Sequence, residues 1–266
     1  MSYNQNHVIR LAEIIEDYSK IGHQVSLKYK DFKFPKEEIA RKYLLLNFIK
    51  RAVYHSTSIQ EILKYNTNIN GYTSSIALLL RGCMLDFLFV MSLQVKLNSS
   101  IEAYDDWAFQ IMGDHFQWDW EKMSSEHKAH YVNLLPPDFF IQDSGNTVPK
   151  YMKRISIAQI TTIIKSSPEY HVCLAATTIY EYLSKFEHFG MFTLMFEYHE
   201  EDMKPYFFYN LVRGIVFIQD AIRKCMINLG FGNTDWLEEI CNTSHKTIDI
   251  YNEIKLDEWE TEEIHQ

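Results

Sequence analysis

Hydrophobic residues recur at helical spacing along most of the chain, with few glycines or prolines between them. Over 6–21 they return every three or four positions, which predicts an amphipathic helix that ends at Gly22. A similar rhythm over 36–64 predicts a second helix, with a break near 54–58. The segment 71–97 is apolar almost all round, so we expect its helix at the centre of the fold.

The middle of the chain is more polar. Ser99 followed by Glu102 has the spacing of a capping box, which predicts the start of a fourth helix. The polar and aromatic stretch 113–131 is either a second short helix or a surface excursion. Three prolines, a glycine and several Asp, Asn and Ser residues make 135–150 the clearest loop and the expected joint of the chain.

The hydrophobic pattern becomes helical again after this loop, and it predicts helices over 155–165, 169–200, 205–229 and 233–256. An acidic, frayed tail is expected over 257–266. No stretch alternates strongly enough to predict a strand. The sequence therefore predicts an all-α fold: one bundle-like domain of seven or eight helices over 1–256.

Composition narrows the choice of partner and compartment. The net charge of −9 argues against a protein that coats nucleic acid non-specifically, although a local basic pocket is compatible with it. The four cysteines show neither a CxxC pair nor metal-ligand spacing, as expected of free thiols in a reducing compartment. Because the N-terminus lacks the pattern of an export signal, we predict a cytoplasmic protein.

A membrane span is not expected either. The apolar segment 76–95 is about long enough to cross a bilayer. However, Arg81 and Asp86 lie near its middle, and each costs about 2.5–3.5 kcal/mol at a bilayer centre. We therefore predict a buried helix of a soluble protein.

Several cofactor classes have no signature in the sequence. It contains no GxGxxG, no GxxxxGK[ST] and no HExxH, and the helical body has no Glu-x-x-His pair for a di-iron site. Glu126, His127 and His130 can share a helix face, either as metal ligands or as a solvated surface. We predict no cofactor and no metal.

Charged residues within apolar helices are the candidate site. Arg81 and Asp86 lie about 140° apart around their helix, so each should seek a partner on another helix. Glu181, Ser184 and His188 form one stripe on a later helix, with Glu187 beside it.

Two interpretations of these residues stay open. In the structural one, Arg81 pairs with Glu187 or Asp220, and the cluster fixes the register of the helices. In the functional one, His188 is an acid/base and Arg81 or Arg213 holds an anion. Ser184 and Glu187 then orient these groups, and Asp86 and Glu181 support them.

Two motifs also carry a family resemblance. "LLLRGCMLD" followed by "YEYLSKFEHFG" resembles an uncharacterised bacterial family of helical proteins, which has an Arg and an acidic residue on one helix and a Tyr…Ser…His run on a later one. The matching positions are Arg81, Asp86, Ser184 and His188. Such proteins look like relatives of the HEPN domains of toxin and phage-defence systems, several of which are metal-independent ribonucleases that act as dimers.

The resemblance implies an RNA-directed protein, either a ribonuclease or an RNA-binding protein, that forms a homodimer. HEPN ribonucleases place a His after an Arg with four to six residues between them. Here Arg51 and His55 have three residues between them, whereas Lys50 and His55 have four. The alternative is a non-catalytic helical module that binds a partner or a small anionic ligand, so the sequence leaves open whether the protein is an enzyme.

Overall fold

The computed structural model describes residues 3–29, 35–67, 69, 71–116, 119–187, 196 and 199–254. Within these residues the chain forms nine α-helices: α1 (Gln5–Lys28), α2 (Lys36–Tyr65), α3 (Thr73–Ser99), α4 (Ile101–Phe116), α5 (Ser125–Leu134), α6 (Ile157–Ile164), α7 (Tyr170–Ser184), α9 (Glu200–Met226) and α10 (Asp235–Glu253). A 3₁₀ turn (Pro137–Phe139) and a π-helical turn (Ile227–Phe231) complete the helical structure described. The predicted all-α fold is confirmed.

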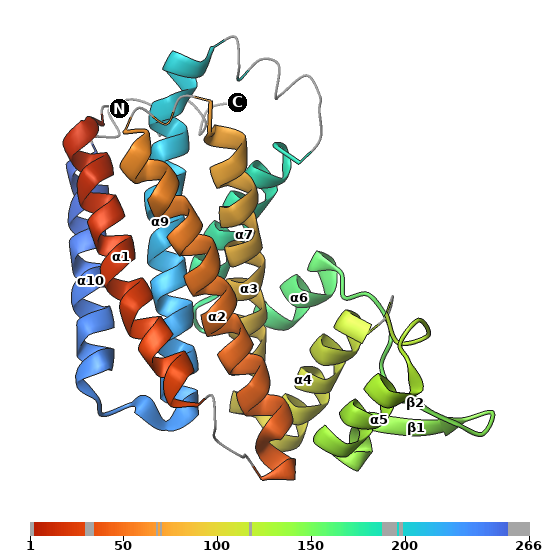
Figure 1. Ribbon diagram of the computed structural model, residues 1–266. Helices are drawn as coiled ribbons and strands as arrows, with labels where there is room; N and C mark the ends of the chain where they lie inside the picture. The colour runs from red at the N-terminus through yellow and green to blue at the C-terminus, as the bar shows by residue number, and fades with distance from the viewer. Residues whose placement is uncertain are drawn as a thin grey trace.

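The long helices stand side by side as an upright bundle (Figure 1). In it α1 packs on α2 and α10, and α9 packs on α10, α2 and α3. The shorter α4, α5 and α6 project from one side of the bundle together with a β-hairpin. We call this projection, residues 101–164, the lobe. The helix α5 lies at the end of the polar stretch for which the sequence allowed either a short helix or a surface excursion.

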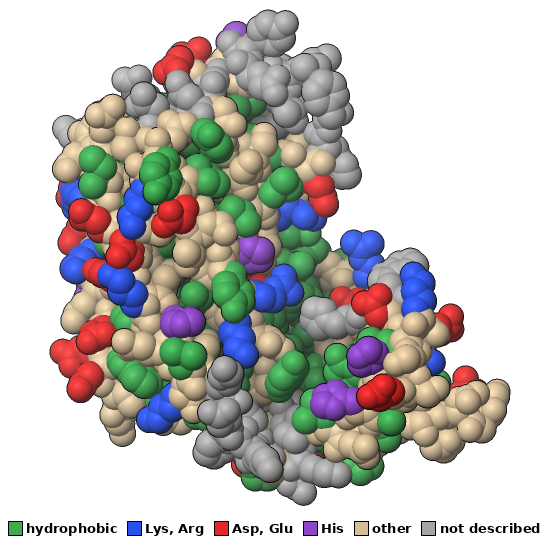
Figure 2. All heavy atoms as spheres, viewed as in Figure 1, with side chains coloured by type: hydrophobic (Ala, Val, Ile, Leu, Met, Phe, Trp, Pro, Cys, Tyr) green, Lys and Arg blue, Asp and Glu red, His purple; other side chains and the backbone are tan. Residues whose placement is uncertain are grey.

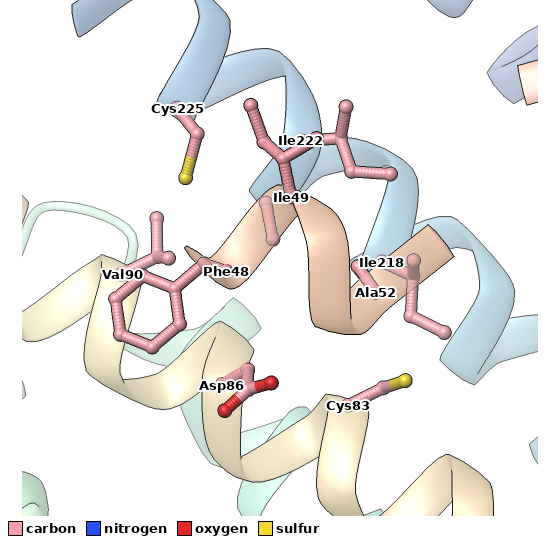
Figure 3. A pocket seen from close by; sticks show the side chains of 10 residues that line it. Phe48, Ile49, Ala52, Cys83, Asp86, Val90, Ile218, Ile222 and Cys225 are labelled. Atoms are coloured by element: carbon pink, nitrogen blue, oxygen red, sulfur yellow. The ribbon is translucent and has the colours of Figure 1, made fainter. Parts of the chain in front are cut away.

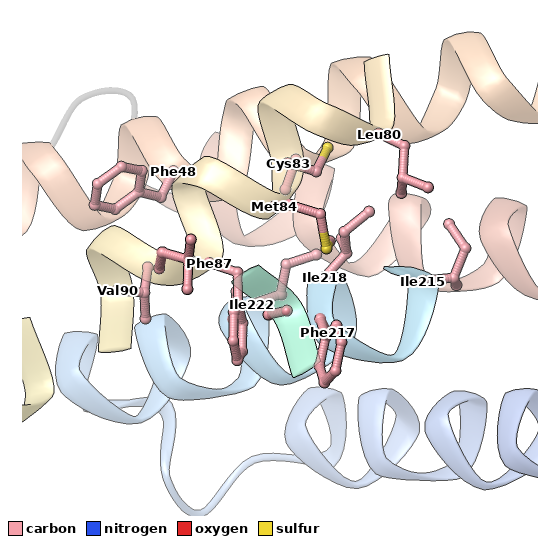
Figure 4. Packing of buried hydrophobic residues seen from close by; sticks show 14 of the residues in the cluster. Phe48, Leu80, Cys83, Met84, Phe87, Val90, Ile215, Phe217, Ile218 and Ile222 are labelled. Atoms are coloured by element: carbon pink, nitrogen blue, oxygen red, sulfur yellow. The ribbon is translucent and has the colours of Figure 1, made fainter. Parts of the chain in front are cut away.

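The helix α3 is the centre of the fold, as its all-round apolar pattern predicts. It contacts α2, α4, α6, α7 and α9. Figure 4 shows Phe87 and Met84 of α3 directed at Phe217 and Ile218 of α9. Helix α3 is also long and apolar enough to cross a bilayer, but 72% of its most apolar window is buried inside the protein. This burial is consistent with a core helix of a soluble protein.

Two helices are longer than the sequence predicts. Helix α1 continues past Gly22 to Lys28 instead of ending at the glycine. A Cβ atom on Gly22 would lie 2.5 Å from Cγ2 of Val53, so this glycine allows α1 and α2 to approach closely. Helix α2 is continuous through 54–58, where a break was expected.

The loop expected over 135–150 contains a β-hairpin that the sequence did not predict. Strand β1 (Phe140–Asp143) pairs antiparallel with β2 (Asn146–Pro149). Ser144 and Gly145, between the strands, both have positive φ angles of 49° and 81°, as a type I′ turn requires. The Ser-Gly pair therefore acts as a hairpin turn, which the strand pattern alone was too short to reveal.

Two helix ends also differ from their predicted positions. Ser100 rather than Ser99 caps α4, because the Ala103 amide donates to its hydroxyl at 3.1 Å. Helix α7 ends at Ser184, although the apolar rhythm predicted a helix that continues to about residue 200. The predicted tail over 257–266 lies outside the described residues.

Candidate functional site

Arg81 of α3 reaches across to the end of α7 and meets three side chains there. Its Nε donates to Ser184 Oγ at 2.9 Å, and its Nη2 donates to the Tyr180 hydroxyl at 3.1 Å. The same Nη2 forms an ion pair with Glu187 Oε2 at 2.9 Å, and the guanidinium lies over the Tyr180 ring. Arg81 therefore ties α3 to α7, and its contact with Glu187 is one of the two that the sequence offered.

The end of α7 is shaped so that this contact can form. The Ser184 hydroxyl donates to the Tyr180 carbonyl, which holds its oxygen lone pairs toward Arg81. The amides of residues 185–187 then each donate to the carbonyl three positions back, so the helix tightens into 3₁₀-type turns. This tightening places Glu187 beside the guanidinium, where a continuing α-helix would carry it elsewhere around the axis.

The cluster formed by Arg81, Tyr180, Ser184 and Glu187 is only partly buried. The Arg81 side chain is 25% exposed and that of Glu187 is 41% exposed. The N–H groups of Arg81 Nη1 have no hydrogen-bond partner among the described residues. The guanidinium therefore keeps donors that an anion can use.

The other predicted site residues do not join this cluster in the described part of the chain. Glu181 is exposed on α7. Arg213 of α9 lies over the ring of Tyr209 on the same helix, and Asp220 pairs with Arg223 and Lys224 of α9 instead of Arg213 or Arg81. His188, the proposed acid/base, lies outside the described residues, as does the glycine that follows it at position 190.

Asp86 points away from Arg81 and pairs with a residue of α2. Its Oδ2 lies 3.2 Å from Nε of Arg51, although the geometry falls short of a hydrogen bond. The Asp86 side chain is 5% exposed, whereas that of Arg51 is 42% exposed. A buried carboxylate thus depends on one arginine at the surface of the bundle.

The surroundings of Asp86 disfavour its charge. Asp86 borders a void of about 10 Å³, room for no more than about one water molecule. Figure 3 shows Cys83 of α3, Cys225 and Ile222 of α9 and Phe48 of α2 around it. Burial raises the pKa of Asp86 to about 7, and Arg51 offsets part of that rise. The carboxyl therefore titrates near neutral pH.

His55 completes a polar patch on this side of α3. It lies one turn after Arg51 on α2, and its ring touches α3 at Gly82, where an added Cβ atom would lie 3.5 Å from Nε2. Burial and the charge of Arg51 lower the pKa of His55, which favours the neutral imidazole. The sequence showed the spacing of Arg51 and His55, but it gave no sign that Arg51 is the partner of Asp86.

A groove of about 460 Å³ opens beside Arg51, between α2 and the lobe. Figure 2 shows hydrophobic side chains, with Lys or Arg side chains near them, where the bundle meets the lobe. The groove is lined by Tyr43, Leu44, Asn47, Phe48, Lys50, Arg51, Tyr54, Met112, Phe116, Asp119, Met123 and Tyr131. Its volume is within the range of ligand-binding clefts.

Metal ligands do not gather in the described part of the chain. Among the residues described, no group of three or more His, Cys, Asp or Glu side chains is placed to hold a metal ion. Arg81, Arg51 and their neighbours are instead groups that bind anions or transfer protons.

Comparison of the chain with protein-family models, with curated proteins and with solved structures gives no match.

Proposed function

We propose that the protein is an RNA-directed, HEPN-like helical protein of a toxin or phage-defence type. The carrying observation is the contact between Arg81 of α3 and Ser184 of α7, 103 positions apart, because it joins the two motifs on which the resemblance rests. In this proposal Arg81 holds a phosphate through its planar fork of donors, and Ser184 and Tyr180 fix the plane of that fork.

His188 is the acid/base of the proposed site, four positions after Ser184. A histidine suits proton transfer near neutral pH, and an arginine that neutralises phosphate charge lowers the cost of the transition state. When the 2′-hydroxyl of RNA attacks the adjacent phosphate, a base takes its proton, the P–O5′ bond breaks, and an acid protonates the leaving 5′-oxygen. A histidine can exchange these protons while an arginine neutralises the phosphate charge, so the reaction does not require a metal ion. We further propose that the protein acts in the cytoplasm as a homodimer.

The experiment compares purified wild-type protein with Arg81→Lys and His188→Ala variants on a labelled RNA pool, for both binding and cleavage. Lysine keeps the charge of Arg81 but loses the fork, so we expect at least about a 10-fold loss of binding or cleavage, the range of a charge-assisted hydrogen bond. Arg223→Lys on α9 is the matched control, since Arg223 forms its ion pair within its own helix.

The possible results distinguish a wrong function from a wrong site. A wild-type protein that neither binds nor cleaves any RNA would exclude an RNA-directed function. RNA activity that survives in both Arg81→Lys and His188→Ala would retain the RNA but move the site away from the α3–α7 contact.

A second candidate function is a non-catalytic helical module that binds a partner or a small anionic ligand. The observation that favours it is the set of contacts of Arg81 with Tyr180, Ser184 and Glu187, which tie α3 to α7 without any ligand. This candidate predicts that Arg81→Lys lowers thermal stability and that the purified protein leaves RNA untouched.

A further inference from the structure

The groove between α2 and the lobe has one wall with a regular chemical pattern. Tyr43, Asn47, Lys50 and Tyr54 follow each other at spacings of four, three and four residues, so they form one stripe along α2. All four line the groove. The two tyrosines are separated by eleven residues, or about 16 Å of helix, with the lysine between them.

The tyrosines of this stripe are unusually open to solvent. Tyr54 is 66% exposed and Tyr43 is 44% exposed, although both are large aromatic residues on a helix of the bundle. Their rings offer faces for stacking that no buried aromatic residue of the core can offer. An exposed ring next to a cation is the combination with which proteins hold an unpaired base and its phosphate.

The groove carries charged groups of both signs. Lys50 and Arg51 line it, against one lining carboxylate, Asp119. Arg51 shares its charge with the buried Asp86, so Lys50 is the cation of the wall that has no carboxylate paired with it among the described residues. On a chain with a net charge of −9, Lys50 is therefore the side chain of this wall that can meet a phosphate.

The far wall of the groove is mostly apolar, with Asp119 as its one carboxylate. Met112, Phe116, Met123 and Tyr131 come from α4, α5 and the segment between them. A flexible methionine adapts its shape to a flat ring, so this wall can cover the second face of a base. A base enters such a slot only when it is unpaired, because both faces of a paired base are stacked within the duplex.

We propose that this groove binds a short single-stranded segment of RNA, with bases stacked on Tyr43 and Tyr54 and the phosphate backbone beside Lys50. The inference rests on the proposed RNA-directed function, and it assigns substrate binding to a surface about which the two sequence motifs say nothing. Two cations are too few to hold a duplex by its phosphates alone, so the aromatic stripe makes the groove selective for single strands.

The first test is fluorescence anisotropy of the full chain with a short labelled single-stranded RNA and with a duplex of the same length. Tyr54→Ala removes one stacking face, and we expect it to weaken single-strand binding about 5-fold or more. The matched control is Tyr65→Ala at the end of α2, where the tyrosine is 88% exposed and lies outside the groove lining. This control should bind as the wild type does.

The second test measures how binding depends on salt. Lys50→Ala removes one phosphate contact, so the slope of log K against log salt should become shallower by about 0.7. Lys246→Ala on α10, an exposed lysine on another helix, is the control and should leave the slope unchanged. Arg51 is left intact in both tests. Its removal would leave the buried Asp86 without a counter-charge, and the fold itself would be destabilised.

The results distinguish this inference from the function on which it rests. If the wild type binds no RNA, both are wrong. If RNA binds but Tyr54→Ala and Lys50→Ala behave like their controls, the groove is not the site, and the RNA-directed function stands. Equal binding of single strand and duplex would also overturn the inference. If the two variants abolish self-association and leave RNA binding intact, the groove is a protein interface.

Discussion

Arg81 and Asp86 lie five positions apart in α3 and both place a charge in this apolar helix, yet their surroundings differ. Arg81 finds two hydroxyls and a half-exposed carboxylate on α7, and it keeps contact with water. Asp86 faces the packed interior, where its one counter-charge is a surface arginine of α2. The charge of Arg81 therefore has hydrogen-bond partners and water, whereas the charge of Asp86 lowers the stability of the fold.

The difference shows that the effect of a charge in an apolar helix depends on the partners that the neighbouring helices supply. Polar partners on α7 and contact with water offset the cost of placing the Arg81 charge in an apolar helix. Asp86 has no such partners, so burial shifts its titration toward neutrality. Perturbed carboxyl groups are common at functional sites, but structural pairs also show such shifts. Four substitutions test the difference between Arg81 and Asp86.

The largest expected effect is that of Arg51→Met, which removes the counter-charge of Asp86. We expect the free energy of unfolding at about pH 9 to fall by about 2–3 kcal/mol, because without Arg51 the buried carboxyl stays protonated, and each pH unit above its folded pKa of about 7 then costs about 1.4 kcal/mol. At about pH 5 the loss should be small, because Asp86 then carries a proton in the folded protein. Urea unfolding at both pH values measures this, and an equal loss at both would contradict it.

Asp86→Asn should have the opposite effect. The folded pKa of about 7 lies above the unfolded value of about 3.9, so the folded protein retains a proton that the unfolded chain has released. Stability therefore falls as pH rises from about 4 to about 7, and the charged form costs up to about 4 kcal/mol above that window.

Asparagine removes the titration but stays polar and buried. We expect Asp86→Asn to gain about 1–3 kcal/mol at about pH 8 and almost nothing near pH 4. Arg51, 42% exposed, loses little because water can solvate it. Paired urea titrations of wild type and variant across this range give the difference directly, and a net destabilisation at about pH 8 would show that the ion pair outweighs the burial cost.

Arg81→Met should cost less and show no comparable pH dependence. The variant loses two hydrogen bonds to neutral hydroxyls and one partly exposed ion pair, worth together about 1–2 kcal/mol. Arg223→Met is the control, with an expected loss of about 0.5 kcal/mol for an ion pair within one helix. If Arg81→Met lowered stability more than Arg51→Met does, the contrast between Arg81 and Asp86 would be wrong.

Glu187→Gln should have the smallest effect on stability, about 0.5 kcal/mol or less, because its carboxylate is 41% exposed. Under the proposed function the same change removes a competitor for the Arg81 guanidinium. RNA should then bind a few-fold more tightly, as anisotropy would show. Unchanged or weaker RNA binding would mean that Arg81 does not contact the phosphate.

The fold could be predicted largely because one rule, the spacing of apolar residues, decides most of it. The central place of α3 and most of the helix positions follow from that spacing. The errors fall where packing or backbone geometry overrides the local pattern. Gly22 looks like a helix end in sequence, but its missing Cβ serves a helix contact, and Ser144 and Gly145 form a turn from backbone angles alone.

The site was harder to predict because its partners are distant in sequence. The spacing within each helix shows which residues share a face, and it brought Arg81, Ser184 and Glu187 into one hypothesis. It could not show that Asp86 meets Arg51, since the relative rotation of α2 and α3 depends on the whole core. Nor could the spacing show the groove. Tyr43 and Tyr54 are large aromatic residues of the kind that fill a core, and only the packing of the helices shows that no neighbouring helix covers them.

The void beside Asp86 has a consequence for the dynamics of the core. Cys83 and Cys225 border it, and burial raises the pKa of both thiols, so a thiol reagent meets neither a thiolate nor an open path in the closed protein. Their alkylation requires that α2, α3 and α9 separate for a moment. The alkylation rate of these two of the four native cysteines therefore reports breathing motions around the buried carboxyl, with no foreign label in the core.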